Sequence, residues 1–146
     1  IFSLLLALLF VKYFDVNNIF LFIVLVLFGA ALLDIDTSQS KIGRKVKIVS
    51  SILNFLFGHR GIIHSLLFAF VVFLIFFLFN RTFLGLSLLI GMISHLLLDA
   101  FTISGVRFFY PSKFRFKGFV KSGGLIDYAL FFVFLALTLF NIISLF

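Results

Sequence analysis

Residues 62–99 read IIHSLLFAFVVFLIFFLFNRTFLGLSLLIGMISHLLLD, and this stretch decides the fold. It contains two long apolar runs, 62–80 and 82–101, which are separated only by a short polar turn. Each run has about the 17–25 residues that a transmembrane helix needs. Because so short a turn requires antiparallel neighbours, the sequence predicts a tight helical hairpin that carries His64 and Asp99 near its outer ends.

The composition extends this prediction to the whole chain. Of its 146 residues, 64% are hydrophobic, 12% are charged and 26 are Phe. Soluble domains are about half apolar and about a quarter charged. A core of this size cannot bury so much apolar surface, so water-soluble classes of protein are excluded. We predict an all-α fold, a polytopic integral membrane helical bundle that forms a single membrane-embedded domain over residues 1–146.

Five segments are predicted to cross the bilayer, and one to lie along its surface. The five spans are approximately 1–14, 17–33, 62–80, 82–101 and 125–146. The chain begins with Ile rather than Met, and we expect its first residues to be the end of a span rather than part of a signal-like segment. Between the second and third spans, basic residues precede apolar ones at helical spacing. This pattern predicts an interfacial amphipathic helix at approximately 42–57, with its basic side toward the lipid headgroups.

The distribution of charge predicts the orientation. The chain has 12 basic and 5 acidic residues, a formal charge of +7. The two long connections, 37–61 and 102–124, hold all the basic residues except Lys12 and Arg81. The positive-inside rule therefore places these connections in the cytoplasm. We expect the partner of this charge to be a bilayer with anionic headgroups, and we expect no nucleic acid partner.

Most of the Asp and His side chains are predicted to gather at the cytoplasmic face. They occur at the ends of the second to fifth spans, and a chain that crosses back and forth brings these ends to one face. The members are Asp34, Asp36, His59, His64, His95, Asp99 and Asp127, which leaves only Asp15 elsewhere. Ionisable groups near the bilayer core cost free energy unless they are paired, hydrated or bound to something. A bound divalent cation would offset this free-energy cost, because it keeps carboxylates ionised and imidazoles neutral.

The segment that ends the fourth span carries the clearest ligand pair. His95 and Asp99 are four residues apart, so they share one helical face and are able to hold a single ion. The alternative is a structural His–Asp hydrogen bond between helices. Taken singly, the Asp34-Ile35-Asp36 segment is weaker evidence for a metal site. Alternate residues of a helix do not share a face, and such a pair of Asp residues is often a solvated helix end.

Two further motifs have a functional and a structural interpretation. In the segment 58–65, His59 and His64 flank a glycine and are able to point toward one centre if the chain turns there. Arg60, between them, is suited to clamp a phosphate or carboxylate, or else to anchor the start of the span. Asp127 lies one turn into the fifth span. Its alternative role is a charge favoured by the helix macrodipole.

Together these residues form a donor set of imidazoles and carboxylates. Because the chain has no Cys, thiolate sites and disulfides are excluded. The set suits Zn first, with Mn or Fe as alternatives, as one or two ions. The predicted ligands are Asp34, Asp36, His59, His64, His95 and Asp99. The predicted catalytic residues are Arg60, Asp36 and Asp127.

The motifs also resemble a known family. The matching stretches are Leu32-Leu33-Asp34-Ile35-Asp36 with Ser40-Lys41-Ile42-Gly43, Gly58-His59-Arg60-Gly61 with His64-Ser65, Ser94-His95-Leu96-Leu97-Leu98-Asp99, Thr102, Gly105 and Tyr110-Pro111. In this order and spacing they resemble the YdjM-type family of inner-membrane metal-dependent hydrolases. The resemblance implies a helical inner-membrane protein with a His/Asp metal centre. The pair His95 and Asp99 is also distantly similar to a ligand pair of the zinc-dependent phospholipase C and P1 nuclease group, which implies phosphoester hydrolysis.

The chain departs from the family pattern at two positions. Leu33 stands where the family usually has Pro, and Asp127 follows Ser-Gly-Gly where the family tends to have Glu after Thr-Gly-Ser. Asp is one methylene shorter than Glu, which puts the role of Asp127 in doubt.

The leading hypothesis is a metal-dependent hydrolase that acts at the cytoplasmic membrane surface on a phosphoester or phospholipid. One alternative is an ion or proton transporter, although the middles of the third and fifth spans are almost wholly apolar and the fourth offers only Ser87 and Ser94. The other alternative is a non-catalytic membrane scaffold with a structural metal site. A structural site would be coordinatively closed, whereas a hydrolytic site keeps a position open for water.

Overall fold

The computed structural model describes residues 1–34 and 62–145, and within these ranges the fold is all-helical. The α-helices are α1 (Phe2–Tyr13), α2 (Ile19–Leu33), α4 (Leu66–Leu78), α5 (Thr82–Phe101) and α6 (Leu125–Leu145), and a short 3₁₀ helix, η2 (Ile62–His64), precedes α4. Each lies inside a segment that the sequence predicts as a span. The predicted interfacial helix at 42–57 lies outside the described residues.

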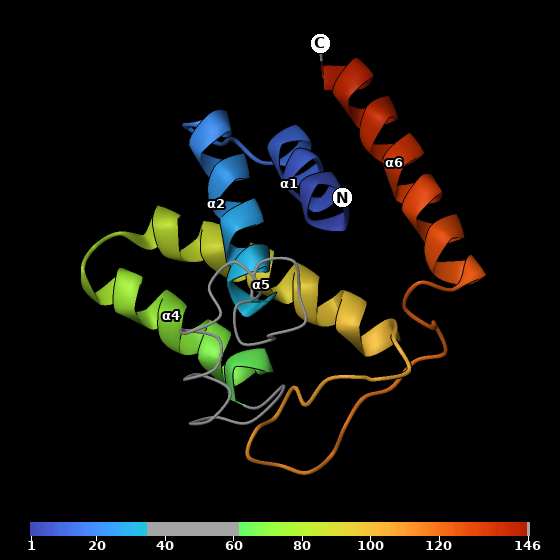
Figure 1. The fold of residues 1–146 in the computed structure, drawn as a ribbon. Helices are drawn as coiled ribbons and strands as arrows, with labels where there is room; N and C mark the ends of the chain where they lie inside the picture. The colour runs from blue at the N-terminus through green and yellow to red at the C-terminus, as the bar shows by residue number, and fades with distance from the viewer. Residues whose placement is uncertain (35–61, 146) are drawn as a thin grey trace.

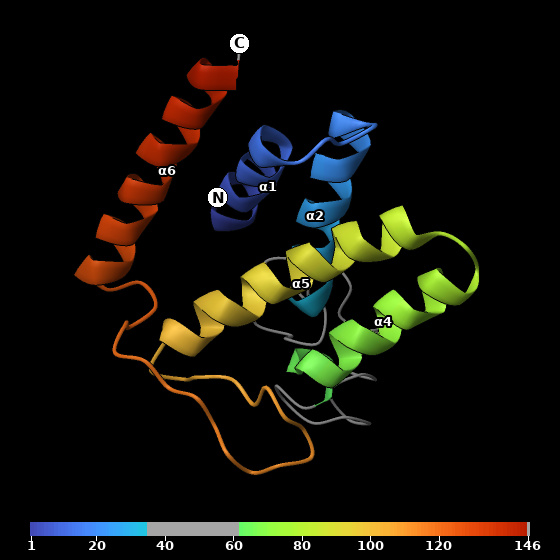
Figure 2. The same cartoon turned by 180° about the vertical axis from the view of Figure 1, so that it is seen from behind.

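Helix α5 is the centre of the arrangement (Figure 1). Helices α2 and α4 both pack extensively against it, and α1 packs mainly against α2 and α6. Figure 2 shows the same order from behind, with α6 standing beside α1 at the edge of the molecule. Helix α5 therefore packs against α1, α2 and α4, whereas α6 packs mainly against α1.

The α4–α5 hairpin forms as predicted, and local capping explains its shape. Ser65 begins α4, because its hydroxyl accepts a hydrogen bond from the Phe68 amide. Asn80 ends the helix in the left-handed region, at φ 55°. The Arg81 amide donates to the Phe76 carbonyl and the Asn80 amide to the Phe77 carbonyl, which is a Schellman motif.

Among the helices that the structure describes, two are long and apolar enough to cross a bilayer, by length and composition. They are α5 and α6, with 20 and 21 residues. Helices α1, α2 and α4 are apolar but have only 12, 15 and 13 residues. A 15-residue helix is about 22 Å long, which is less than the hydrocarbon core of about 30 Å. The helical content of the five predicted spans is therefore confirmed, while five crossings stay a prediction.

The buried core lies beside the predicted ligand residues. One apolar cluster combines side chains from α2, η2, α4, α5 and the connection that follows α5: Leu33, Ile63, Ala69, Met92, Leu96 and Val106. A second cluster, between α1 and α2, contains Ala7, Phe22 and Val26. The first cluster holds the ends of three helical segments together, which positions the candidate site.

Candidate metal centre

Helix α5 positions the first two donors. His95 and Asp99 are one turn apart on the same face, and the His95 Nε2 atom lies 3.9 Å from Asp99 Oδ2. Both side chains are largely shielded, with 18% and 14% of their surface exposed, and the Oδ2 atom of Asp99 is buried. The i, i+4 pair predicted from the sequence therefore faces inward, toward the neighbouring segments.

The third donor, His64, comes from the turn before α4. It is the last residue of η2 and is almost fully buried. Its Nε2 atom lies 3.8 Å from Asp99 Oδ2, and its ring meets that of His95 edge to face at a centroid distance of 5.6 Å. The hairpin turn explains this meeting, because it brings the start of one helix to the end of the next.

Asp34, at the C-cap of α2, approaches these three donors from another helix. Its Oδ1 atom lies 3.9 Å from His95 Nε2, and 40% of its side chain is exposed. Asp34 is therefore the member of the group that faces the open side.

Two glycines allow α2 to approach α5 closely enough for this contact. A Cβ atom at Gly91 would lie 2.0 Å from the Val26 carbonyl oxygen, and one at Gly29 would lie 2.4 Å from the Leu88 carbonyl oxygen. Small residues of this kind permit close crossing of membrane helices. His95 follows Gly91 by one turn, and Asp34 follows Gly29 by just over one turn. The crossing therefore fixes the distance between the two donors.

The donor geometry suits a single small cation. One ligand atom from each of His64, His95 and Asp99 lies within 4.8 Å of the other two. The three His–Asp separations of 3.8–3.9 Å exceed the length of a direct hydrogen bond, which is about 3.2 Å or less. Ligands about 2.1 Å from one tetrahedral ion stand about 3.4 Å apart, so small inward movements of these side chains would complete the shell. Two imidazoles and a carboxylate fit Zn, Mn or Fe.

The connection that follows α5 covers this end of the bundle. Val106, on this connection, is buried in the apolar cluster, and the Leu66 amide at the start of α4 donates to the Phe108 carbonyl. Thr102 donates its hydroxyl to the Asp99 carbonyl, which fixes the exit from α5. The segment therefore limits access to the His64 side of the group.

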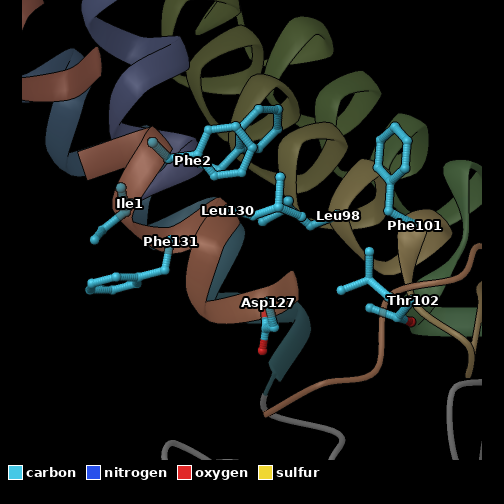
Figure 3. A pocket seen from close by; sticks show the side chains of 10 residues that line it. Ile1, Phe2, Leu98, Phe101, Thr102, Asp127, Leu130 and Phe131 are labelled. Carbon is cyan, nitrogen blue, oxygen red and sulfur yellow. The ribbon is translucent and has the colours of Figure 1, made fainter. Parts of the chain in front are cut away.

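Asp127 has a different environment from the other predicted ligands. It does not belong to the group whose donor atoms converge, and its Oδ2 atom accepts a hydrogen bond from the Gly123 amide at 2.8 Å. Figure 3 shows it at the edge of a mostly apolar pocket of about 180 Å³, lined by residues of α1, α5 and α6 such as Phe2, Leu98 and Leu130. This contact favours the interpretation of Asp127 as a charge that stabilises the start of α6.

The remaining predicted site residues, Asp36, His59 and Arg60, lie outside the described residues. The structure thus brings together Asp34, His64, His95 and Asp99, which the sequence predicts to converge.

A family profile with the description "YdjM inner membrane protein" matches residues 1–145, nearly the whole chain. The chain belongs to this family. The YdjM resemblance seen in the motifs is thereby confirmed, and the chain is a membrane protein. No solved structure matches it.

This YdjM-family chain is similar to curated proteins of Bacillus subtilis and Escherichia coli. It is 43% identical over 94 residues to "Uncharacterized protein YvsG" of Bacillus subtilis, covering 61% of this chain and 56% of the relative. It is 35% identical over 90 residues to "Inner membrane protein YdjM" of Escherichia coli, covering 58% of this chain and 46% of the relative. The matched part of the chain spans about half the length of these curated relatives.

The structure of this YdjM-family member also shows residues that the sequence analysis missed. Gly29 and Gly91 set the distance between α2 and α5, although neither was singled out. Ser3 was not singled out either, and its Oγ forms a buried hydrogen bond of 2.7 Å with the Ser94 hydroxyl, which links α1 to α5. The sequence signal for these residues was their small size inside otherwise bulky apolar runs, a pattern typical of helix interfaces in membranes.

Proposed function

We propose that this chain is a membrane-bound metal-dependent hydrolase that acts at the cytoplasmic membrane surface on a phosphoester or phospholipid. The observation that carries the proposal is the convergence of His64, His95 and Asp99, from two helical segments, at one largely shielded point. Such a group is costly to bury unless it binds something, and a cation satisfies all three members at once. The distant similarity to the phospholipase C and P1 nuclease group supports phosphoesters as the substrate class.

In this proposal His64, His95 and Asp99 are the inner ligands, and Asp34 is the ligand on the open side. Asp36 and His59 are proposed as further ligands or as holders of a second ion. A bound divalent ion supplies a more acidic water molecule and polarises a phosphoryl oxygen. Because Asp34 is the most exposed of the four, water and substrate approach from its side.

The other catalytic roles follow from the sequence. Asp36, where it does not ligate, accepts the proton of the attacking water. Arg60 holds the anionic group of the substrate through paired hydrogen bonds. Asp127 is the weaker candidate for the proton acceptor, because its carboxylate already accepts a hydrogen bond from the Gly123 amide.

The decisive first experiment is the metal content of the detergent-purified protein, measured by elemental mass spectrometry. We expect near-stoichiometric Zn, Mn or Fe in the wild type, and loss of most of it in His95→Ala/Asp99→Ala. The double variant Asp15→Ala/Asn17→Ala, in the exposed connection between α1 and α2, is the matched control and should keep its ion. A wild type that stays metal-free after each ion is added back would overturn the metal centre.

Activity is tested next, with the metal-loaded protein. Phosphodiester, phosphomonoester and phospholipid substrates should include at least one that the wild type hydrolyses and the His95→Ala/Asp99→Ala variant does not. Metal binding without hydrolysis of any of these substrates would instead favour a scaffold with a structural ion.

A further inference from the structure

The connection between α5 and α6 contains a second group of like charges that the metal centre does not use. Arg107, Lys113, Arg115 and Lys117 line one shallow hollow of about 440 Å³. Among the residues that the structure describes, none of these four side chains forms an ion pair, because the ion pairs there join His to Asp. The hollow is therefore a concentrated positive surface without an acidic partner in the described chain.

Backbone pairing holds these charges together. Val106 and Phe116 form an antiparallel bridge with hydrogen bonds of 2.9 Å in both directions. This register places Arg107 opposite Arg115. Lys113 and Lys117 lie two residues on either side of Arg115, and all four side chains line the same hollow. Like charges placed opposite each other destabilise a strand pair, so the arrangement favours an anion in the hollow.

One guanidinium is fixed in place. Arg115 Nη1 donates to the Ser104 carbonyl at 3.3 Å. This contact orients the guanidinium before any ligand arrives, and a guanidinium binds phosphate oxygens in fork geometry.

Aromatic side chains alternate with the basic residues in the same segment. Phe116 packs edge to face against Phe108 and Phe114, with ring centroids 5.1 and 4.9 Å apart. Phe109, Phe114 and Phe119 nevertheless leave 62%, 64% and 72% of their surfaces exposed. Exposed Phe beside clustered Arg and Lys is typical of segments that sit in the interface of an anionic membrane. These rings distinguish a lipid from a free anion, because only a lipid offers them an apolar partner.

We propose that the hollow formed by Arg107, Lys113, Arg115 and Lys117 is a binding site for the phosphate headgroup of an anionic phospholipid. The neighbouring Phe side chains enter the acyl region of the same leaflet. This site anchors the end of the bundle at which α5 terminates (Figure 2). It requires neither the ion nor the hydrolysis proposed above.

The test is a calorimetric titration of the detergent-solubilised protein with dihexanoyl phosphatidylglycerol, dihexanoyl phosphatidylcholine and inorganic phosphate. We expect the wild type to prefer phosphatidylglycerol over both other ligands. Removing two of the four charges in Arg107→Gln/Arg115→Gln should weaken phosphatidylglycerol binding about 30-fold. Because Arg115 has a structural contact, Lys113→Gln/Lys117→Gln serves as a second variant with the same expected loss.

The charge-matched control is Arg81→Gln/Lys121→Gln, which removes two positive charges outside the hollow and should change the affinity by less than about twofold. The His95→Ala variant should bind phosphatidylglycerol like the wild type, which separates this site from the metal centre. Equal affinity for the two lipids, phosphate binding as tight as phosphatidylglycerol binding, or unchanged affinity in both hollow variants would overturn the proposal. Tighter binding of a short RNA at the same salt concentration would also overturn it.

Discussion

Helices α5 and α6 are nearly equal in length and hydropathy but differ in what surrounds them. Yet 39% of the apolar stretch of α5 is buried inside the protein, compared with only 11% of the apolar stretch of α6. Helix α5 carries Gly85, Gly91, His95 and Asp99, whereas α6 presents mostly Leu and Phe to its surroundings. Hydrophobic length therefore identifies both helices as candidate spans, but small and polar residues identify the one around which the bundle packs.

The largest effect is expected where α5 touches α2. In Gly91→Leu, the new Cβ would meet the Val26 carbonyl, so the two helices must separate. We expect the free energy of unfolding, measured by denaturant titration in detergent, to fall by about 3 kcal/mol or more. Ala136→Leu on the exposed face of α6 should change it by less than about 0.5 kcal/mol. Equal effects of the two substitutions would remove the distinction between the helices.

A charge in the middle of α6 should be expensive for a different reason. Val133 is 53% exposed and lies near the centre of the helix. If α6 spans the bilayer, Val133→Arg should raise the apparent free energy of inserting this helix by about 3 kcal/mol. The inserted fraction is measured by glycosylation mapping. Val133→Leu should insert like the wild type. Full insertion of the Arg variant would mean that α6 does not face lipid at this depth.

The smallest effect is expected where α6 contacts the rest of the protein. Asn141 is 7% exposed and donates to the Leu137 carbonyl of its own helix. A hydrogen bond of this kind contributes about 0.5–1.5 kcal/mol net, so Asn141→Leu should lower the free energy of unfolding by about 0.5 kcal/mol. Ile143→Leu, on the exposed face, is the control. A loss as large as that of Gly91→Leu would show that α6 is an integral part of the core.

Much of the fold was predictable because apolar runs and helices coincide in this chain. The run 82–101 is a helix over its whole length, and the polar turn at Asn80 ends the preceding helix. The run 62–80 is instead interrupted near its start, because Ser65 caps α4 and leaves Ile62 and Ile63 in a separate turn. A hydropathy average over the whole run conceals this break, since only His64 and Ser65 interrupt an otherwise apolar sequence.

The candidate site was predictable in its membership but not in its geometry. The alternation of spans predicts that Asp34, His64, His95 and Asp99 converge, and the structure places them together. Neither the exposure of Asp34 nor the glycine crossing that positions it follows from the pattern of a single helix. The crossing depends on which partner each helix chooses, and hydrophobic periodicity carries no information about partners in a chain that is apolar on most faces.

The hairpin turn at Asn80 also has a consequence for the order of assembly. All three members of the His64–His95–Asp99 group lie within one continuous stretch of chain, folded back on itself at a turn of a few residues. Closing so short a loop costs little conformational entropy compared with joining distant segments. All three residues are therefore synthesised before α6. Pairing of the two neighbouring helices α4 and α5 is enough to bring them together.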